Sequence, residues 1–359
     1  MKEKYNFAVV GATGLVGGTM LTVLAERSGL PIDKVFAVAS SRSAGSQVEF
    51  RGSFLPVADI AEFDFSQVDI ALFAGGDVAS ADYVKKAAAA GALVIDNSST
   101  FRMHEDVPLV VPEVNGETIK ENHGIIANPN CSTIQMMSAV APLHRAWGLV
   151  SLSVASYQSV SGAGKEAVKE LRQQATEFLQ ACEAVSGHCA QSAAGELAKK
   201  ESVFPRPIAF NLFPQIGSFD IDGNSTEETK MVNETKKILG LPNLPVVATC
   251  VRVPVFFAHS EVVHVGFSKP TSVEEAKAIL SQAPCVRLLD DPSEGIYPTP
   301  LDGEHQDDVV VGRIRRDPTS ENGLVMWVVA DNLRKGAATN AVNIAQAWIE
   351  LQAESGRQS

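Results

Sequence analysis

A glycine-rich turn directly after the first apolar run constrains the fold of this chain more than any other feature. The run Asn6–Val10 is short and apolar, and Gly11-Ala12-Thr13-Gly14-Leu15-Val16-Gly17 separates it from a helical pattern. Glycines between a strand and a helix permit a tight bend and let backbone N–H groups approach a pyrophosphate. The spacing G-x-x-G-x-x-G departs from the common G-x-G-x-x-G, so the position of the turn carries the prediction of a dinucleotide site. The alternative is a turn without a ligand.

Strand and helix patterns alternate through the first 130 residues. Short apolar runs predict strands, and apolar residues at helical spacing predict helices between them. Such alternation implies right-handed β-α-β units and a parallel sheet. The predicted strands are Asn6–Val10, Val35–Ala39, Ile70–Ala74, Leu93–Ile95 and Ile125–Ala127, and the predicted helices are Leu15–Arg27 and Val78–Ala90.

Longer alternating strands follow, which indicates a second kind of domain. The chain has 359 residues, more than one hydrophobic core usually serves. We therefore predict an α/β protein in which residues 1–130 and 331–359 form a Rossmann-type domain. Residues 131–330 are predicted to form an α+β domain with a mostly antiparallel sheet. The remaining predictions are helices at Ser132–Trp147, Ala163–Cys182, Val273–Leu280 and Ala337–Gln352, strands at Val150–Tyr157, Ser260–Phe267, Val309–Arg315 and Val325–Ala330, and a long irregular, functional or interface-covering stretch at Ala184–Asn224.

Charge and cysteine content exclude several classes of protein. Thirty basic residues against 42 acidic ones give a net charge of −12, so the chain has no global attraction for nucleic acid or an anionic membrane. Any anionic ligand must be held by a few local cations. Five cysteines without a C-x-x-C pair indicate neither a disulfide framework nor a thiolate zinc site. With no signal-peptide core and no apolar run that could span a bilayer, a cytoplasmic protein is expected.

The end of the second predicted strand indicates which nicotinamide cofactor is bound. A site that prefers NAD usually carries an acidic residue there, which binds the ribose 2′-hydroxyl. The strand Val35–Ala39 instead leads into Ser40, Ser41, Arg42 and Ser43. A guanidinium and hydroxyls suit a 2′-phosphate, so we predict NADP as the cofactor. The alternative is that Arg42 is an ordinary solvated cation.

Cys131 stands between a short strand and a long helix, in the sequence Asn128-Pro129-Asn130-Cys131-Ser132-Thr133. A helix N-terminus lowers the pKa of a thiol and favours the nucleophilic thiolate, so we expect a reactive cysteine here. Beside a nicotinamide ring, a thiolate can add to an aldehyde, lose hydride and become a thioester, which phosphate then cleaves to an acyl phosphate. The alternative is a structural cysteine, which we assign to Cys182, Cys189, Cys250 and Cys285.

Six motifs in order along nearly the whole chain resemble those of the aspartate-β-semialdehyde dehydrogenase family. The SSRSAG stretch at Ser40–Gly45 also fits the NADP-binding turn of that family. The six motifs are GATGLVG at the N-terminus, DNSSTFR at Asp96–Arg102, NPNCST at Asn128–Thr133, SVSGAGK at Ser159–Lys165, EETK at Glu227–Lys230 and VRVPVFFAHSE at Val251–Glu261.

The resemblance implies a role for each matching residue. It implies NADPH-dependent, reversible conversion of L-aspartyl-4-phosphate to L-aspartate 4-semialdehyde and phosphate, on the route to lysine, methionine and threonine. Cys131 would be the nucleophile, His259 the general acid or base and Gln158 the residue that orients the intermediate. The substrate contacts would be Arg252 at the α-carboxylate, Glu227 near the amino group, and Arg102, Asn130 and Lys230 at the phosphate; the cofactor contacts would be Gly11, Thr13, Gly14, Leu15, Val16, Gly17, Ser40, Ser41, Arg42, Ser43, Ser161, Gly162 and Asn332.

Strand geometry sets a condition on two of these assignments. His259 and His264 are five positions apart, so in a regular strand at most one of them faces a given cleft. We choose His259 on the resemblance and expect His264 to be structural. Arg252 and His259 would also face opposite ways on an unbroken strand, so a break near Pro254 is predicted. The other histidines show no ligand spacing, and no metal is predicted; they are His104, His123, His144, His188 and His305.

Three other functions compete with this assignment. N-acetyl-glutamyl-phosphate reductase has the same chemistry, but its cysteine region favours a glycine before and an aromatic residue after the cysteine, where Asn130 and Ser132 stand here. Glyceraldehyde-3-phosphate dehydrogenase is more distant, because its acidic NAD determinant is missing. A non-catalytic NADP-binding protein would keep the glycine turn without the other motifs. The family is dimeric or tetrameric, and we expect a homodimer through the second sheet, or a homotetramer; the sequence does not decide between them, nor does it show feedback control.

Overall fold

The first sheet of the protein lies at its N-terminal end and is largely parallel. In the computed structural model, which describes residues 2–183 and 202–358, this sheet has seven strands in the order β3-β4-β2-β1-β5-β6-β7. Only the edge pair β3–β4 is antiparallel among the pairings of this sheet. The strands are β1 (Tyr5–Val10), β2 (Ile32–Ala39), β3 (Gln47–Phe50), β4 (Ser53–Asp59), β5 (Ile70–Phe73), β6 (Leu93–Asp96) and β7 (Ile125–Ala127).

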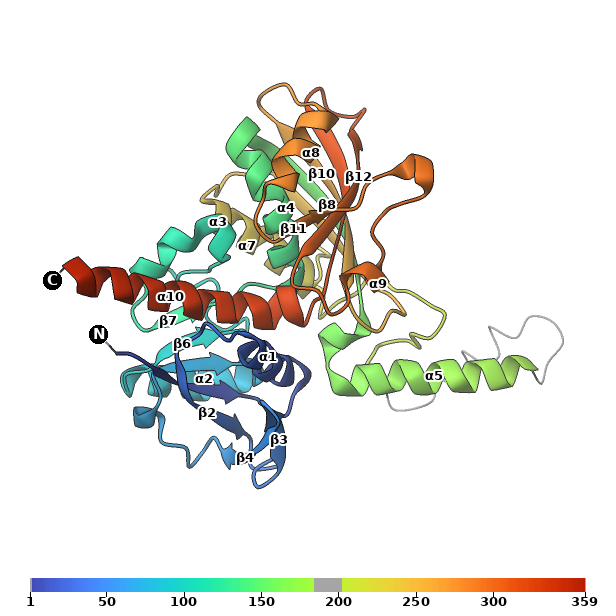
Figure 1. The fold of residues 1–359 in the computed structure, drawn as a ribbon. Helices are drawn as coiled ribbons and strands as arrows, with labels where there is room; N and C mark the ends of the chain where they lie inside the picture. Colours follow the sequence, from blue (N-terminus) through green and yellow to red (C-terminus); the bar gives the residue numbers. More distant parts are fainter. Residues whose placement is uncertain (1, 184–201, 359) are drawn as a thin grey trace.

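Helices cover both faces of this sheet, which gives the Rossmann-type arrangement (Figure 1). Helix α1 (Leu15–Glu26) and the C-terminal helix α10 (Thr339–Gln358) share one hydrophobic core with one face. Helix α2 (Gly76–Ala89) contacts β5 and β6, and it packs on the opposite face. The central strands β1 and β5 carry apolar, buried residues at nearly every position. Since successive residues of a strand point to opposite faces, both faces of the sheet are apolar and buried here.

The second sheet is mixed, and antiparallel pairs predominate in it. Its order is β11-β12-β13-β10-β8-β9. The pairs β12–β13, β13–β10 and β10–β8 are antiparallel, and the two outer pairs are parallel. The strands are β8 (Leu149–Gln158), β9 (Val246–Arg252), β10 (His259–Phe267), β11 (Val286–Leu288), β12 (Val309–Arg316) and β13 (Gly323–Ala330).

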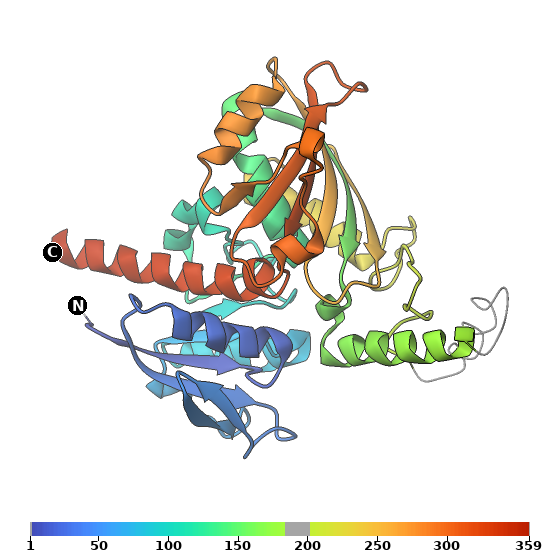
Figure 2. The same cartoon turned by 45° about the vertical axis from the view of Figure 1, so that its right-hand side comes forward.

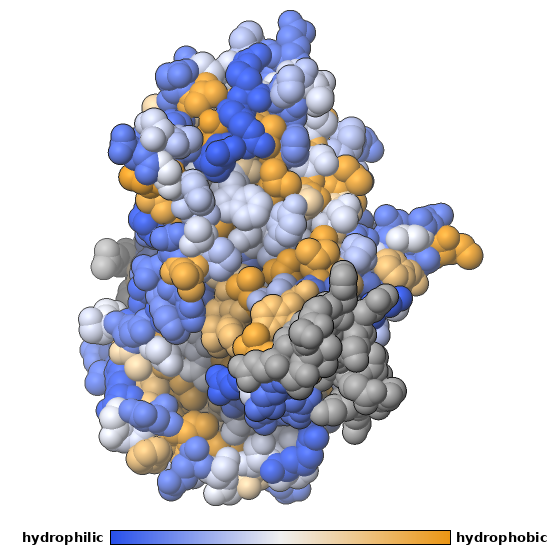
Figure 3. Space-filling view, turned by 90° about the vertical axis from the view of Figure 1, so that its right-hand side faces the viewer, coloured by the Kyte–Doolittle hydropathy of each residue, from blue (hydrophilic) through white to orange (hydrophobic). Residues whose placement is uncertain are grey.

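Three helices pack on one face of the second sheet. Helix α4 (Cys131–Trp147) contacts the central strands, α7 (Thr226–Leu239) contacts β9, and α8 (Val273–Ser281) contacts β11 and β12. Helix α5 (Lys165–Glu183) instead projects from the body of the molecule, as two views show (Figures 1 and 2). The side from which α5 projects carries apolar surface among polar surface (Figure 3). In residues 202–224, the large apolar side chains that are exposed are Val203, Phe210, Leu212, Phe219 and Ile221.

Short helices complete the described fold. They are α3 (Pro112–Asn115), α9 (Pro300–Gly303), the 3-10 turns η1 (Phe65–Gln67), η2 (Gly116–Glu121), η3 (Val160–Ala163) and η4 (Pro292–Glu294), and the π-turn η5 (Arg334–Ala338). No helix in the described ranges combines the length and the apolar character needed to cross a bilayer.

The elements predicted from the sequence are confirmed in type, with small shifts of their ends except for α10, which ends at Gln358 and not at Gln352. Apart from the short helices and turns named above, five described elements were not predicted: β3, β4, β9, β11 and α7. Residues 202–224 are irregular, as expected, whereas 184–201 lie outside the described residues. The packing of α10 against the first sheet favours the proposed division into 1–130 with 331–359 and 131–330, which stays a prediction.

Candidate active site

A cleft of about 530 Å³ lies between the two sheets, and it brings most of the predicted site residues together. One wall includes Val16 of α1, and another comes from the start of α4 and the end of β8. The π-turn η5 and the irregular residues 216–218 complete it. The predicted residues that line the cleft are Val16, Arg102, Asn130, Cys131, Gln158, Ser161, Gly162, Glu227, Lys230, Arg252 and Asn332.

Cys131 is the first residue of α4, one position earlier than the helix predicted from the sequence. The preceding Asn130 forms the N-cap, and its side-chain oxygen accepts hydrogen bonds from the amides of Ser132 at 2.9 Å and Thr133 at 3.3 Å. This cap explains why the helix begins here, because it satisfies amide groups that would otherwise lack partners. Cys131 is partly exposed to the cleft.

The prediction of a lowered thiol pKa at Cys131 is wrong for the protein without ligands. Burial, followed by the nearby carboxylate of Glu227, raises the pKa of Cys131 to about 12. Arg102 and Arg252 act in the opposite direction, as does the amide of Ser132 at the helix start, but they are outweighed. The helix terminus alone therefore does not make this thiol a thiolate.

Glu227 is the centre of a polar cluster beside Cys131. It lies in the first turn of α7, and its Oε1 accepts a hydrogen bond of 2.7 Å from the side-chain amide of Asn130. The side-chain amide of Gln158, at the end of β8, lies 3.3 Å from the same oxygen. Lys230, one turn further along α7, places its Nζ 3.6 Å from the other oxygen. The cluster fixes one carboxylate at the cleft next to the cysteine.

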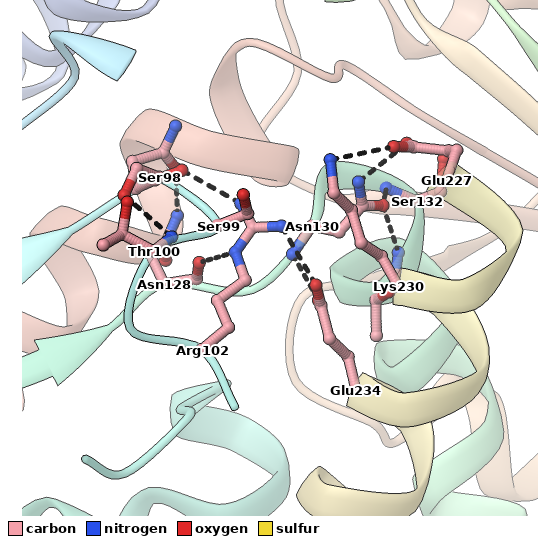
Figure 4. A network of polar contacts seen from close by, with 12 residues as sticks. Ser98, Ser99, Thr100, Arg102, Asn128, Asn130, Ser132, Glu227, Lys230 and Glu234 are labelled. Atoms are coloured by element: carbon pink, nitrogen blue, oxygen red, sulfur yellow. Dashed lines mark hydrogen bonds and ion pairs between the residues drawn. The ribbon is translucent and has the colours of Figure 1, made fainter. Parts of the chain in front are cut away.

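Glu234 is a site residue that the sequence analysis missed. Its carboxylate accepts a hydrogen bond from the backbone amide of Asn130 at 2.6 Å and forms an ion pair with Arg102 at 3.0 Å. The Glu234 side chain is 1% exposed. Arg102 also donates to the carbonyl oxygens of Asn128 and Asn97. Figure 4 shows Glu234 reaching Arg102 from the same helix that carries the Glu227 cluster. Arg102 lines the cleft. These three hydrogen bonds do not use every N–H donor of its guanidinium, so the remaining donors can bind an anion.

His259 is fully buried behind the cleft at the start of β10, and its neighbours define its tautomer. The backbone amide of Ser159 donates to Nδ1 at 3.0 Å, so Nδ1 carries a lone pair and the proton of the neutral ring is on Nε2. Burial and the nearby Arg252 hold the pKa of His259 well below its usual range. Its Nε2 has no hydrogen-bond partner among the described residues. His259 is thus a neutral donor.

Ser159 links His259 to the predicted cofactor contacts, and the sequence analysis gave it no role. Its hydroxyl lies 3.0 Å from Nδ1 of His259 and 3.1 Å from both the Ser161 hydroxyl and the side-chain oxygen of Asn332. Asn332 also accepts from the backbone amide of Ala258. The three polar side chains are buried, so this cluster fixes the wall that they form.

The predicted break between Arg252 and His259 is confirmed. Strand β9 ends at Arg252 and β10 begins at His259, and β8 lies between these two strands. Ala258 has a positive φ of 65°, which turns the chain into β10. The buried Arg252 donates to the Ser159 carbonyl oxygen at 2.6 Å. A Cβ at Gly162 would lie 3.1 Å from Nη1 of Arg252 and 3.3 Å from Nε2 of His259, so both groups approach this glycine.

His264 lies further along β10 and, as expected, has a structural partner. Its Nδ1 lies 2.7 Å from a carboxylate oxygen of Asp317, and the site cleft does not include it. Across the described ranges, no cluster of three or more His, Cys, Asp or Glu side chains has an arrangement that could hold a metal ion.

The glycine turn fits a dinucleotide by its backbone. Gly11 has a φ of +85°, and a Cβ there would lie 2.6 Å from the Ala74 carbonyl oxygen. A Cβ at Gly17 would lie 2.1 Å from the carbonyl oxygen of Gly11, so only glycine permits this approach. Gly14 is the N-cap of α1 and offers no side chain to the first amides. These amides remain available to a pyrophosphate. Of the other predicted residues here, Leu15 begins α1 and Val16 lines the cleft.

The turn after β2 approaches the glycine turn through one contact. The hydroxyl of Thr13 lies 3.2 Å from that of Ser43. Ser40, Ser41 and Arg42 are exposed in this turn, which has no carboxylate. The turn thus presents hydroxyls and a guanidinium at the surface.

The Rossmann-type sheet, the second sheet and the cleft that holds Cys131 belong to a protein of the semialdehyde dehydrogenase class. Two family models agree with this class: "Semialdehyde dehydrogenase, NAD binding domain" matches residues 6–122, and "Semialdehyde dehydrogenase, dimerisation domain" matches residues 140–335. Within this class, the aspartate-semialdehyde dehydrogenase of Legionella pneumophila is 48% identical over 349 residues, 96% of each chain. The chain belongs to the aspartate-semialdehyde dehydrogenase family.

Solved structures support the family assignment. Aspartate semialdehyde dehydrogenase II of Vibrio cholerae, solved in complex with ASA, has a TM-score of 0.89 and 45% identity, covering 97% of this chain and 99% of its own. The enzyme of Candida albicans, solved with NADP, has a TM-score of 0.71 and 26% identity, covering 96% of this chain and 98% of its own.

Proposed function

We propose that this protein reduces L-aspartyl-4-phosphate to L-aspartate 4-semialdehyde and phosphate with NADPH, through a thioester on Cys131, and that it also catalyses the reverse reaction. The observation that carries the proposal is the position of Cys131. It is the first residue of a helix, in a cleft that is also lined by Val16 of α1, two buried arginines and a buried carboxylate. Names of close relatives point to the same substrate.

The charges at the cleft complement those of the substrate. We assign Arg252 to the α-carboxylate, because a guanidinium presents a fork of donors that matches a carboxylate. Glu227 receives the ammonium group, and Arg102, Asn130 and Lys230 receive the phosphate. Glu227 raises the pKa of Cys131, so an ammonium bound there would oppose that effect and favour the thiolate.

The chemical steps then use the residues around the sulfur. The Cys131 thiolate adds to the acyl carbon, and the phosphate leaves with its electron pair, which forms the thioester. When bound, the cofactor supplies hydride to the thioester carbon. Nε2–H of His259 donates toward the oxygen of the reacting group, and the carbon–sulfur bond breaks to release the aldehyde. Gln158 lies beside Glu227 and orients the intermediate.

NADP is the proposed cofactor, because Arg42 and the hydroxyls of Ser40, Ser41 and Ser43 suit a 2′-phosphate. The glycine turn, from Gly11 to Gly17, would hold the pyrophosphate, and Ser161, Gly162 and Asn332 would contact the nicotinamide end. The neighbour from Candida albicans carries NADP, which supports this choice. We place the reaction on the route to lysine, methionine and threonine, and the cytoplasmic location expected from the sequence stays a prediction.

A homodimer through the second sheet is the proposed assembly. The helices α4, α7 and α8 cover one face of this sheet, so its other face is available to a second copy. The family model that matches residues 140–335 is described as a dimerisation domain, which supports the proposal. Sedimentation of the purified protein should show a dimer or a tetramer, and a monomer at micromolar concentration would refute the proposal.

A direct assay tests the proposed reaction. The protein is mixed with aspartate semialdehyde, inorganic phosphate and NADP⁺, and the absorbance of NADPH is followed. We expect turnover by the wild type, none by Cys131→Ala, and retained turnover by Cys285→Ala as the matched control. N-acetylglutamate semialdehyde serves as the competing substrate. No signal from the wild type, or a preference for the acetylated substrate, rejects the proposal.

A further inference from the structure

The π-turn η5 forms the wall of the cleft against Cys131. Two hydrogen bonds of this turn join residues five positions apart, as is typical of a π-helix. The Gly336 amide donates to the Asp331 carbonyl oxygen and the Ala338 amide to that of Leu333, each at 3.0 Å. A Cβ added at Gly336 would lie 2.8 Å from Cβ of Cys131. The wall is therefore in close contact with the cysteine, and its position limits where the sulfur can point.

Lys335, the residue before this glycine, points away from the cleft and is fully buried. Its ammonium group is ion-paired with Glu113, which belongs to the short helix α3. The hydroxyl of Ser138, on α4, donates to the same carboxylate oxygen at 2.7 Å. Although burial acts to raise the pKa of Glu113, Lys335 and these hydrogen bonds hold it below its usual range, so Glu113 carries its negative charge. The ion pair thus ties the back of the wall to α3 and to the helix of Cys131.

A buried ion pair of this kind gains little stability over apolar residues of similar volume, because both charges lose their water. What it does provide is one defined position for the turn. We propose that the Lys335–Glu113 pair is a positioning unit for the nucleophile, which holds Gly336 against Cys131 and so sets the direction of the sulfur. This inference rests on the role of Cys131 in the proposed function.

The pair acts by position rather than by charge. The main causes that shift the pKa of Cys131 are burial, Glu227, Arg102, Arg252 and the Ser132 amide. Lys335 and Glu113 are not among them. Removing both charges should therefore change the reactivity of the thiol by the same factor at every pH, without changing the shape of its pH profile.

The test uses the full chain with the double substitution Lys335→Met and Glu113→Leu, which removes both charges together. Ser138 keeps a partner in this variant, because its hydroxyl also lies 3.0 Å from the Ile134 carbonyl oxygen. We expect thermal unfolding close to that of the wild type and unchanged KM values. kcat should fall by roughly 10-fold to 100-fold, because an error of about 1 Å in the position of a reacting atom costs that much. Alkylation of Cys131 by iodoacetamide should become several-fold faster at every pH, because the wall that shields the sulfur is loosened.

Arg334 provides the matched control within the same turn. Its guanidinium pairs with Glu26 and Asp307 on the side of α1, away from Cys131. Arg334→Met should leave the alkylation rate of Cys131 at the wild-type value. Should the double variant fail to fold, Lys335→Gln with Glu113→Gln is used instead, because it also removes both charges together, with a change expected in the same direction.

Three results would overturn the inference. One is wild-type kcat and alkylation in a folded double variant. Another is a loss of kcat without any change in alkylation, because the sulfur would then not have moved. The third is an equal change in Arg334→Met, which would indicate general loosening. Since alkylation needs no substrate, its result stands even if the wild type fails to oxidise aspartate semialdehyde.

Discussion

The ammonium group of Lys165 donates a hydrogen bond to the carbonyl oxygen of Thr13. Lys165 is the first residue of α5, whereas Thr13 belongs to the glycine turn after β1, so the bond joins two segments that are 152 positions apart in the chain. The Thr13 hydroxyl in turn approaches Ser43 in the turn after β2. A cation therefore stands where the phosphates of a dinucleotide would approach the glycine turn.

Replacing this cation should weaken cofactor binding. We expect Lys165→Met to raise the dissociation constant of NADP⁺ about 10-fold, because a charge-assisted hydrogen bond to phosphate is lost. Calorimetric titration checks this without any turnover. Lys169→Met is the control, since Lys169 lies one turn further along α5 and pairs with Glu166 in solvent.

Titration with ADP-ribose, which has the pyrophosphate but no 2′-phosphate, identifies the phosphate concerned. Equal weakening of ADP-ribose and NADP⁺ assigns Lys165 to the pyrophosphate, and weakening of NADP⁺ alone assigns it to the 2′-phosphate. Unchanged binding of NADP⁺ by Lys165→Met contradicts both.

Glu227 should control the ionisation of Cys131. Its carboxylate raises the pKa of the thiol, so Glu227→Gln is expected to lower that pKa and speed alkylation of Cys131 at neutral pH. The same variant should have a higher KM for aspartate semialdehyde, because the ammonium group of the substrate loses its partner. Glu228→Gln is the control, since the Glu228 side chain accepts from the backbone amides of Ser225 and Cys250. Slower alkylation in Glu227→Gln would contradict the assignment.

Arg252 should not tolerate lysine despite the equal charge. Its guanidinium donates to the Ser159 carbonyl oxygen and lies 5.9 Å from the centre of the Phe204 ring, which fixes the plane of the fork. A lysine keeps the charge but not the two parallel donors. We expect Arg252→Lys to lower kcat/KM for aspartate semialdehyde roughly 100-fold. The exposed Arg206→Lys serves as the control, and comparable activity of the two variants would show that charge alone suffices.

The sequence predicted those parts of the site that local chemistry dictates. The glycine turn and the N-terminal cysteine of α4 both depend on residue types within a few positions of each other. Helix α7 was missed, although Ser225 and Glu228 form a capping box, a pattern that the sequence does show. Its recognition would have placed Glu227 and Glu234 on one helix.

Long-range contacts explain what the sequence could not show. Glu234 acquires its role only because α7 approaches Arg102, which is 132 positions earlier in the chain. The pKa of Cys131 was predicted with the wrong direction for the same reason. A local argument considers the helix terminus, whereas burial and a carboxylate from a distant helix decide the result.

Glu261 is a fully buried carboxyl group whose ionisation should cost stability. It lies on β10, two residues after His259, and neither of its oxygens has a hydrogen-bond partner of regular geometry among the described residues. Burial raises the pKa of Glu261 well above its usual value, and only the side chain of Gln135 acts against this. Because the folded state holds the proton more tightly than the unfolded state, the stabilisation is complete below the unfolded pKa and is lost as the pH rises toward the folded pKa.

Glu261→Gln should therefore raise the melting temperature at neutral pH but not at a pH below the unfolded pKa of about 4.3. The amide keeps the size of the carboxyl group and cannot ionise, so it avoids a loss of about 1.4 kcal/mol for each pH unit between the two pKa values. Thermal unfolding of both proteins at several pH values measures the difference. Glu304→Gln, at a site nearer the surface, is the control and should show no such divergence. If Glu261→Gln melts below the wild type at neutral pH, the carboxyl group has a partner that stabilises its charge, and the assignment of a neutral Glu261 is wrong.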